Sequence, residues 1–95
     1  MPTYILVYRR PPTYVPTPDT TPHWQAFLAA IGDRLVDRGL AVFSETTEGD
    51  CSPDSTVLGG YSLIEAEDLA AARELARGCP HLLWGGGVEV GELSS

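Results

Sequence analysis

The last third of the chain decides the fold. It reads Leu58-Gly-Gly-Tyr-Ser-Leu-Ile-Glu65, then Leu69-Ala-Ala-Ala-Arg-Glu-Leu-Ala-Arg77, then Gly85-Gly-Gly-Val-Glu-Val90. These three stretches are typical of a strand, a helix and, after a glycine-rich turn, a second strand. The triple glycine precedes a strand and not a helix, so it favours a backbone turn over a phosphate-binding loop.

The boundaries of these elements follow from their flanking residues. We expect the first strand over 56–65, where its two adjacent glycines allow a bulge or the close approach of another backbone. Asp68 is placed to cap a helix over 69–77, and Gly78 is placed to end it. Valines alternate with a glutamate in the last strand, predicted over 88–93, which gives it one apolar face.

The N-terminal part begins with an apolar strand and continues into a proline-rich loop. Residues 4–8 (Tyr-Ile-Leu-Val-Tyr) include no charged residue, which is typical of a strand covered on both faces. A loop over 10–22 holds five prolines, so it can be neither a helix nor a central strand. We expect an ordered crossing over the domain, with Tyr14 and Val15 giving it little to bury.

An amphipathic helix follows this loop. Thr21 is a capping residue and Pro22 fits the first helical turn. The pattern predicts a helix that ends at Gly39, with an apolar stripe formed by Trp24, Phe27, Leu28, Ile31 and Leu35. A short strand is expected over 40–44, and a polar hairpin connection over 45–55.

The predicted order is β-α-β-β-α-β within one domain spanning residues 1–95. This is the α+β ferredoxin-like unit, an antiparallel four-stranded sheet with both helices on one face. Because the strand at residues 4–8 is apolar or aromatic at every position, its second face also needs a cover. We therefore expect a homodimer of the dimeric α/β barrel kind, with a cavity for a small molecule between the sheet and the neighbouring subunit.

Charge and composition exclude several classes of partner. Six basic residues against thirteen acidic ones give a formal net charge of −7, which disfavours nucleic acid and anionic membrane partners. No apolar run reaches the roughly 20 residues of a membrane span, so the expected location is the cytoplasm. Cys51 and Cys79 are expected to remain thiols there. The acidic loop residues Glu45, Glu48 and Asp50 match no established metal loop, and neither a metal nor a cofactor is expected.

A few residues are candidates for a functional site. His81, in the turn after the second helix, could act as a general acid or base, although a surface or capping role competes with that interpretation. His23, at the start of the first helix, is a weaker candidate because a helix N-terminus disfavours a cationic imidazole. The aromatic residues Tyr8, Tyr61 and Trp84 could line the expected cavity, or could simply form a dimer core.

The chain resembles the YCII-related (DGPF-domain) family. The resemblance rests on Trp24-x-x-Phe27, on residues 31–39, on the run from Leu58 to Ala66, and on the segments 78–81 and 86–90. It implies the same ferredoxin-like dimeric barrel, while most members of that family have no assigned activity. This chain has Glu-Gly-Asp-Cys at 48–51 where many relatives have Asp-Gly-Pro-Phe, so the role of that aspartate does not carry over.

Two hypotheses for the function remain open at this point. The first is a small cofactor-independent enzyme of the isomerase or lyase type, which transfers a proton on a cyclic or aromatic compound through His81 and a tyrosine such as Tyr61. The second is a non-catalytic dimeric module that binds a ligand or a regulatory partner. The enzyme hypothesis requires His81 or His23 to line the same cavity as Tyr8 or Tyr61.

Overall fold

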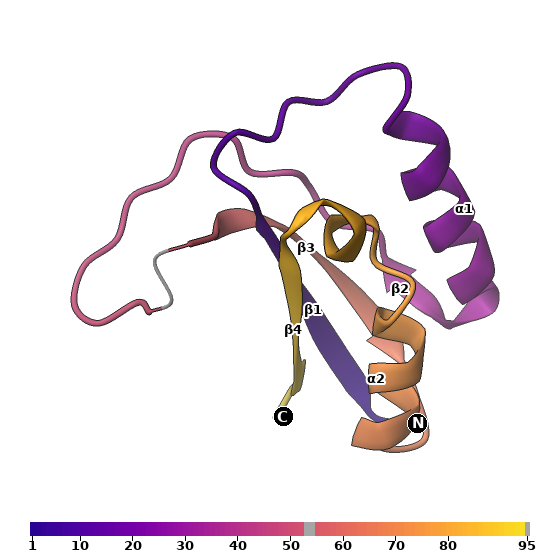
Figure 1. Cartoon of the computed structure of the whole chain (residues 1–95). Coiled ribbons are helices and arrows are strands. Elements are labelled where there is room, and N and C mark those ends of the chain that lie inside the picture. Colours follow the sequence, from indigo (N-terminus) through magenta and orange to yellow (C-terminus); the bar gives the residue numbers. More distant parts are fainter. Residues whose placement is uncertain (53–54, 95) are drawn as a thin grey trace.

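The computed structural model describes residues 1–52 and 55–94 (Figure 1). Two short 3₁₀ helices, η1 and η2, accompany two α-helices and four strands. The order along the chain is β1 (Thr3–Arg10), α1 (Thr21–Ile31), η1 (Gly32–Arg34), β2 (Leu35–Asp37), β3 (Val57–Glu65), α2 (Leu69–Ala76), η2 (Pro80–Trp84) and β4 (Gly87–Glu92).

The four strands form one antiparallel sheet in the order β2-β3-β1-β4. The long strands β1 and β3 are central, and the two helices lie on the same side of the sheet (Figure 1). This is the α+β ferredoxin-like arrangement that the sequence predicts. Of the segments the structure describes, no helix is long and apolar enough to cross a membrane.

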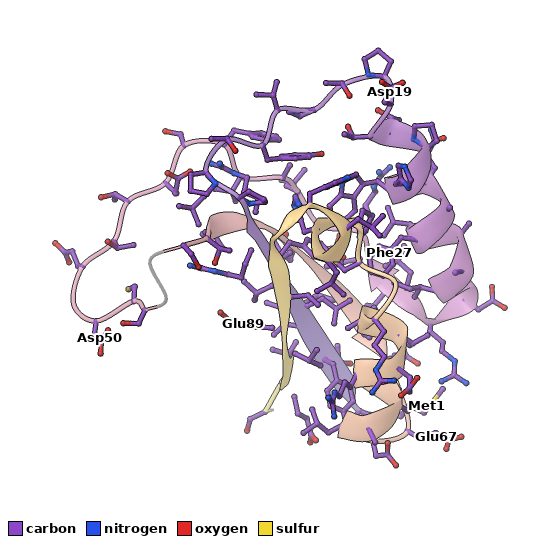
Figure 2. All side chains as sticks on the ribbon, in the orientation of Figure 1. Met1, Asp19, Phe27, Asp50, Glu67 and Glu89 are labelled. Atoms are coloured by element: carbon purple, nitrogen blue, oxygen red, sulfur yellow. The ribbon has the colours of Figure 1, made fainter. Side chains whose placement is uncertain are left out.

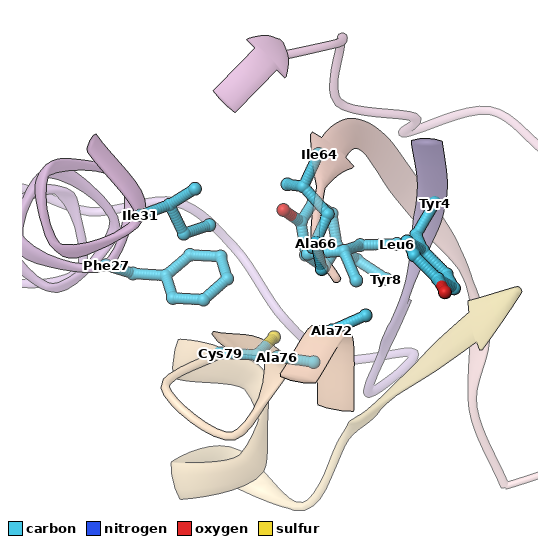
Figure 3. Packing of buried hydrophobic residues seen from close by; sticks show 10 residues of the cluster. All are labelled: Tyr4, Leu6, Tyr8, Phe27, Ile31, Ile64, Ala66, Ala72, Ala76 and Cys79. Carbon is cyan, nitrogen blue, oxygen red and sulfur yellow. The ribbon is translucent and has the colours of Figure 1, made fainter. Parts of the chain in front are cut away.

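The core lies between the sheet and the helices. Alternate residues of β1 (Tyr4, Leu6 and Tyr8) are buried on the helix side. Phe27 and Ile31 of α1 and the small side chains of α2 pack toward them (Figure 3). Alanine at the α2 contact positions allows a close approach of that helix to the sheet, as the sequence indicates.

The other face of β1 is only partly covered. Ile5 and Val7 are half-buried, whereas their neighbours in the strand are buried. Ile5 lies opposite Leu63, and Val7 lies opposite Tyr61 across the β1–β3 pair, so β3 continues the same open face. The expectation that β1 is covered on both faces therefore does not hold within a single chain.

The first helix is shorter than its apolar pattern predicts. It ends at Ile31 because Gly32 adopts a positive φ of 61°, a conformation that suits glycine, and donates its backbone N–H to the Leu28 carbonyl. Leu35, four residues beyond Ile31, continues the apolar spacing but begins β2. It still packs against the core, now from a strand.

The start of α1 also differs in detail from the prediction. The N-cap position falls on Thr20, with Thr21 the first helical residue and Pro22 the second. The Thr20 hydroxyl makes no capping bond to the helix and instead exchanges two hydrogen bonds with the backbone of Thr17. The proline therefore carries the start signal, while the threonine stabilises the turn before it.

The second strand lies earlier than predicted. The strand is Leu35–Asp37, and the segment 40–44 that the sequence favours makes only an isolated bridge from Ala41 to Gly60. Gly60 has a φ of 142°, and the register of β1 and β3 shifts beside it, which is the bulge expected at the paired glycines. That irregularity prevents a continuous ladder, although Val42 and Leu40 still hydrogen-bond to β3.

The boundaries of β3, α2 and β4 agree with the prediction to within one residue, whereas β1 extends two residues beyond its predicted end, to Arg10. Asp68 caps α2 by accepting a hydrogen bond from the Ala71 N–H at 2.8 Å. Val88 and Val90 face the helices opposite Tyr8 and Leu6, and Glu89 faces the other way. The polar connection expected over 45–55 forms an extended excursion, and its residues 53–54 lie outside the described part.

Candidate functional site

A cavity of about 320 Å³ lies on the helix side of the sheet. Its walls come from α1, from the proline-rich segment 11–20, from the turn and segment 38–43, and from β1 and β3. Aromatic and polar side chains line it together: Tyr8, Tyr14, Thr20, Thr21, Trp24, Gln25, Arg38, Phe43, Tyr61, Ser62 and His81. We expected a ligand cavity between two subunits, but this cavity is built by one chain.

A chain of hydroxyl groups crosses the cavity wall. The Tyr8 hydroxyl donates to Ser62 Oγ at 2.8 Å, and the Ser62 hydroxyl donates to the Arg38 carbonyl oxygen at 2.6 Å. Tyr8 and Ser62 lie side by side on the helix face because β1 and β3 are paired there. Burial raises the pKa of Tyr8 to about 12, so its phenol stays protonated at neutral pH.

The direction of this chain is determined by its last member. A carbonyl oxygen only accepts hydrogen bonds, so the Ser62 hydroxyl donates to the Arg38 carbonyl. The Ser62 oxygen in turn accepts the hydrogen bond from the Tyr8 hydroxyl. The Tyr8 hydroxyl hydrogen is therefore used in the bond to Ser62, while the lone pairs on the Tyr8 oxygen remain available as acceptors. Toward the cavity, Tyr8 therefore offers a hydrogen-bond acceptor.

His81 is the most deeply buried titratable group beside this cavity, with 2% of its surface exposed. It lies in η2, which Pro80 begins and Gly85 ends with a φ of 85°. Its carbonyl accepts the Gly86 N–H at 2.8 Å, which fixes the turn. Its side-chain Nδ1 is buried and has no hydrogen-bond partner among the described residues.

The surroundings keep the imidazole of His81 neutral. Burial is the larger cause, and the positive charge of Arg10 the smaller, of a pKa lowered to about 4. Arg10 is itself buried, paired with Glu45 and hydrogen-bonded to the Val42 carbonyl at 3.2 Å. At neutral pH His81 can thus accept a proton or a hydrogen bond.

Aromatic rings enclose the imidazole on several sides. The rings of Trp24 and Tyr14 lie 5.0 and 4.8 Å from it in edge-on arrangements. The Trp24 N–H donates to the Tyr14 hydroxyl at 3.3 Å, and Tyr14 stacks on Trp84 at 5.5 Å. These contacts fasten the proline-rich segment over α1 and η2, where we had expected Tyr14 to bury little.

The structure brings together some of the predicted site residues. His81 and Tyr8 line the same cavity, as the enzyme hypothesis requires, and Tyr61 contributes to its wall. By register, however, the Tyr61 side chain belongs to the opposite face from Tyr8. Trp84 packs against Tyr14 and His81. The ring of exposed His23 lies edge-on to the ring of Trp84, with 5.7 Å between the ring centroids.

Other residues of the site were not found from the sequence. Trp24 was assigned only to the apolar stripe of the helix, and neither Ser62 nor Arg38 was proposed as a site residue. The alternation in β3 places Ser62 on the apolar face, and that was the one available signal, because a buried serine needs a hydrogen-bond partner. The position of Arg38 depends on the unexpected end of α1.

The other candidate groups lie apart from this cavity. Cys79 is a buried thiol whose pKa burial raises to about 11, and Cys51 is exposed in the loop that carries Asp50 at its outer end (Figure 2). Of the loop carboxylates, Glu45 pairs with Arg10. Within residues 1–52 and 55–94, no group of three or more His, Cys, Asp or Glu side chains is arranged to hold a metal ion.

The fold and cavity define a small α+β chain of the ferredoxin-like class, and comparison with known families assigns it further. The profile of the YCII-related domain matches residues 1–93, so the chain belongs to the YCII-related domain family. This confirms the resemblance noted from the sequence. A comparison with curated proteins gives no match.

One solved structure shares the fold over almost the whole chain. It is the 5-chloro-2-hydroxyhydroquinone dehydrochlorinase TftG from Burkholderia phenoliruptrix AC1100, in complex with 2,5-dihydroxybenzoquinone. The similarity has a TM-score of 0.59 and 18% sequence identity, and covers 96% of this chain and 93% of that one. At this identity the likeness concerns the fold.

Proposed function

We propose that the cavity binds a small planar ring compound carrying hydroxyl groups, and that His81 accepts a proton from it. The observation that carries this proposal is that His81, whose buried Nδ1 has no hydrogen-bond partner among the described residues, lines the same cavity as Tyr8. Buried polar atoms are usually hydrogen-bonded, so an unpartnered imidazole nitrogen on a residue of the cavity wall favours a ligand that supplies the missing partner.

The wall selects for hydroxyl groups because it offers two acceptors. The Tyr8 hydroxyl donates its hydrogen bond to Ser62, which leaves the lone pairs of its oxygen as acceptors, and neutral His81 has an unpartnered Nδ1 among the described residues. The surrounding rings of Tyr14, Trp24 and Phe43 favour a flat apolar body. A hydroxylated aromatic ring or a hydroxyquinone combines these features. The solved relative, which binds 2,5-dihydroxybenzoquinone, supports the same class of compound.

The proton-transfer step follows from the protonation states. His81, neutral at pH 7, takes a proton from a ring O–H, or from an sp³ ring carbon next to a carbonyl group in the keto tautomer, and the bonding electron pair stays on the substrate as a phenolate or an enolate. The anion formed beside the imidazolium raises the pKa of His81, which offsets its burial. We assign the tyrosine of the site to Tyr8 in place of Tyr61, because only the Tyr8 side chain shares the helix face with Ser62.

A pair of ligands tests the binding step. Hydroquinone should bind at least about tenfold more tightly than 1,4-dimethoxybenzene, because the ether has no O–H groups to donate hydrogen bonds to Tyr8 and His81. His81→Asn should weaken hydroquinone binding, and His23→Gln, which alters the exposed imidazole, should not. Equal binding of the two compounds, measured by isothermal titration calorimetry, would contradict the proposal.

Isotope exchange tests the catalytic step and separates the two hypotheses. In D₂O, the chain should accelerate exchange of the ring hydrogens of 2,5-dihydroxybenzoquinone, followed by proton NMR, and His81→Asn should abolish the acceleration. Tight binding without accelerated exchange would favour the alternative, a ligand-binding module that does not catalyse.

We further propose that a second copy of the chain covers the open face of the sheet. The half-buried Ile5, Val7 and Leu63 support this, because they extend an apolar surface over the two central strands. Val7→Lys should convert a dimer into a monomer in analytical ultracentrifugation. Leu83→Lys, at an exposed position of η2, serves as the control. A wild-type chain that sediments as a monomer at all concentrations would contradict this.

A further inference from the structure

The charge of the cavity wall differs from the charge of the whole chain. The chain carries thirteen acidic and six basic residues. Among the described residues that line the cavity, however, none is acidic and one, Arg38, is basic. The carboxylates of Asp19, Asp50, Glu67 and Glu89 lie on the periphery of the molecule (Figure 2). A ligand entering the cavity therefore meets a local positive charge on an otherwise negative protein.

The backbone of Arg38 is held firmly against the sheet. Its carbonyl accepts the Ser62 hydroxyl at 2.6 Å, and the next residue, Gly39, donates its N–H to Asp37 Oδ1 at 2.9 Å. Gly39 has a φ of 70° and lies so close to Tyr61 that a Cβ atom there would be 1.8 Å from the Tyr61 carbonyl oxygen. The turn 37–39 thus has one well-defined position, which places Arg38 in the wall of the cavity.

The guanidinium of Arg38 forms no ion pair among the residues that the structure describes. The ion pairs formed among the described residues use Arg9, Arg10 and Arg77, and leave Arg38 without a carboxylate partner. Asp37, its neighbour in sequence, directs an oxygen to the Gly39 amide. An exposed arginine that forms no ion pair with the described residues, fixed by its backbone beside an aromatic cavity, is suited to a carboxylate or another planar anion.

We propose that Arg38 is a specificity-determining residue and that the cavity takes ring compounds bearing a single negative charge in preference to neutral ones of the same shape. This inference rests on the proposed function, since it names the substrate class of the same cavity. Arg38 pairs with the anionic substituent, while Tyr8 and His81 receive the ring hydroxyls. No residue of the machinery that moves the proton is involved in this selection.

Two ligands of nearly equal shape test the charge preference. At low salt, 2,5-dihydroxybenzoate should bind roughly three- to tenfold more tightly than 2,5-dihydroxybenzamide, as expected for an ion pair at a partly exposed site. Arg38→Gln should remove this preference by weakening only the binding of 2,5-dihydroxybenzoate, whereas Arg38→Lys should retain part of the preference. Arg73→Gln, which removes an exposed charge from α2, should leave both affinities unchanged.

The outcomes distinguish this inference from the proposed function. If both compounds bind equally, or if the preference survives in Arg38→Gln, the role of Arg38 is wrong although the cavity still binds hydroxylated rings. If neither compound binds to the wild-type chain, the proposed function fails and the role of Arg38 fails with it. Increasing the salt concentration should reduce the affinity for the carboxylate and leave that for the amide unchanged.

Discussion

The hydroxyl of Tyr8 lies 2.8 Å from Ser62 Oγ and donates a hydrogen bond to it across the central pair of strands. Through the second bond, from Ser62 to the Arg38 carbonyl, this contact joins the middle of the sheet to the turn that begins one wall of the cavity. A single serine therefore determines both the orientation of the Tyr8 phenol and the position of Arg38.

Replacing Ser62 by alanine should destabilise the fold measurably. The change leaves the buried Tyr8 hydroxyl and the Arg38 carbonyl without their partner, which costs about 1–3 kcal/mol in the free energy of unfolding. Urea denaturation of Ser62→Ala, Tyr8→Phe and the double variant measures this. The double variant should be less destabilised than the sum of the single changes, because the two residues share one bond. Strict additivity would contradict the coupling.

Substitution of Gly39 should be far more damaging than the same change at Gly49. Both glycines have a φ near 70°, but Gly39→Ala also places a Cβ atom 1.8 Å from the Tyr61 carbonyl oxygen, whereas nothing lies within 4 Å at Gly49. We expect Gly49→Ala to cost about 1 kcal/mol of backbone strain and Gly39→Ala more than about 4 kcal/mol. Thermal unfolding of the two variants checks this, and similar melting temperatures would refute the close packing of the turn.

The order of the elements could be predicted from the sequence because local signals agree with the fold. The glycine pair at 59–60, the cap at Asp68 and the alternation of Val88 and Val90 each indicate the structure that forms. The end of α1 could not be placed, because the apolar spacing of Ile31 and Leu35 continues through Gly32. A single helix that runs past Leu35 satisfies that spacing, and so does a shorter helix followed by a strand that begins at Leu35.

His81 should make stability depend on pH below neutrality. Its pKa is about 6.5 in an unfolded chain and is lowered to about 4 in the fold, so the unfolded chain binds more protons between these values. This contribution is complete above pH 6.5 and is lost as the pH falls through 4. It amounts to at most about 3 kcal/mol.

Variants separate the contribution of His81 to the free energy of unfolding from that of the carboxylates, which also bind protons as the pH falls. The free energy of unfolding should fall more steeply from pH 6.5 to 4.5 in the wild-type chain than in His81→Gln, because only the wild type carries the buried imidazole. His23→Gln should keep the wild-type slope, since His23 is exposed. Parallel curves for His81→Gln and wild type would show that His81 is not held neutral by the fold.

Removal of the Tyr14 ring should loosen the proline-rich segment. Tyr14 contacts both tryptophans of the chain, through the hydrogen bond from Trp24 and the stack on Trp84. Tyr14→Ala should therefore shift tryptophan fluorescence to longer wavelength and weaken hydroquinone binding several-fold. Val15→Ala, a change at the exposed neighbouring position, should do neither. Unchanged fluorescence in Tyr14→Ala would contradict the contacts.

The site itself was only partly predictable. The aromatic and histidine candidates were visible as residue types, and three of them, Tyr8, Tyr61 and His81, line the cavity. Ser62, Arg38 and Tyr14 were not assigned to the site because their roles depend on tertiary contacts: a cross-strand bond, a turn set by Gly39, and a loop folded back over η2. Apart from the alternation that puts Ser62 on the apolar face of β3, no local pattern in the sequence encodes these contacts.

The most direct test of the account is the imidazole NMR spectrum of the chain during titration with hydroquinone. The chain has two histidines, so the ring nitrogens of His81 and His23 can be assigned with single substitutions. We predict that the ligand shifts the His81 Nδ1 resonance as that atom gains a hydrogen bond, while the His23 resonances stay in place. A bound ligand that leaves His81 unchanged would contradict the central claim.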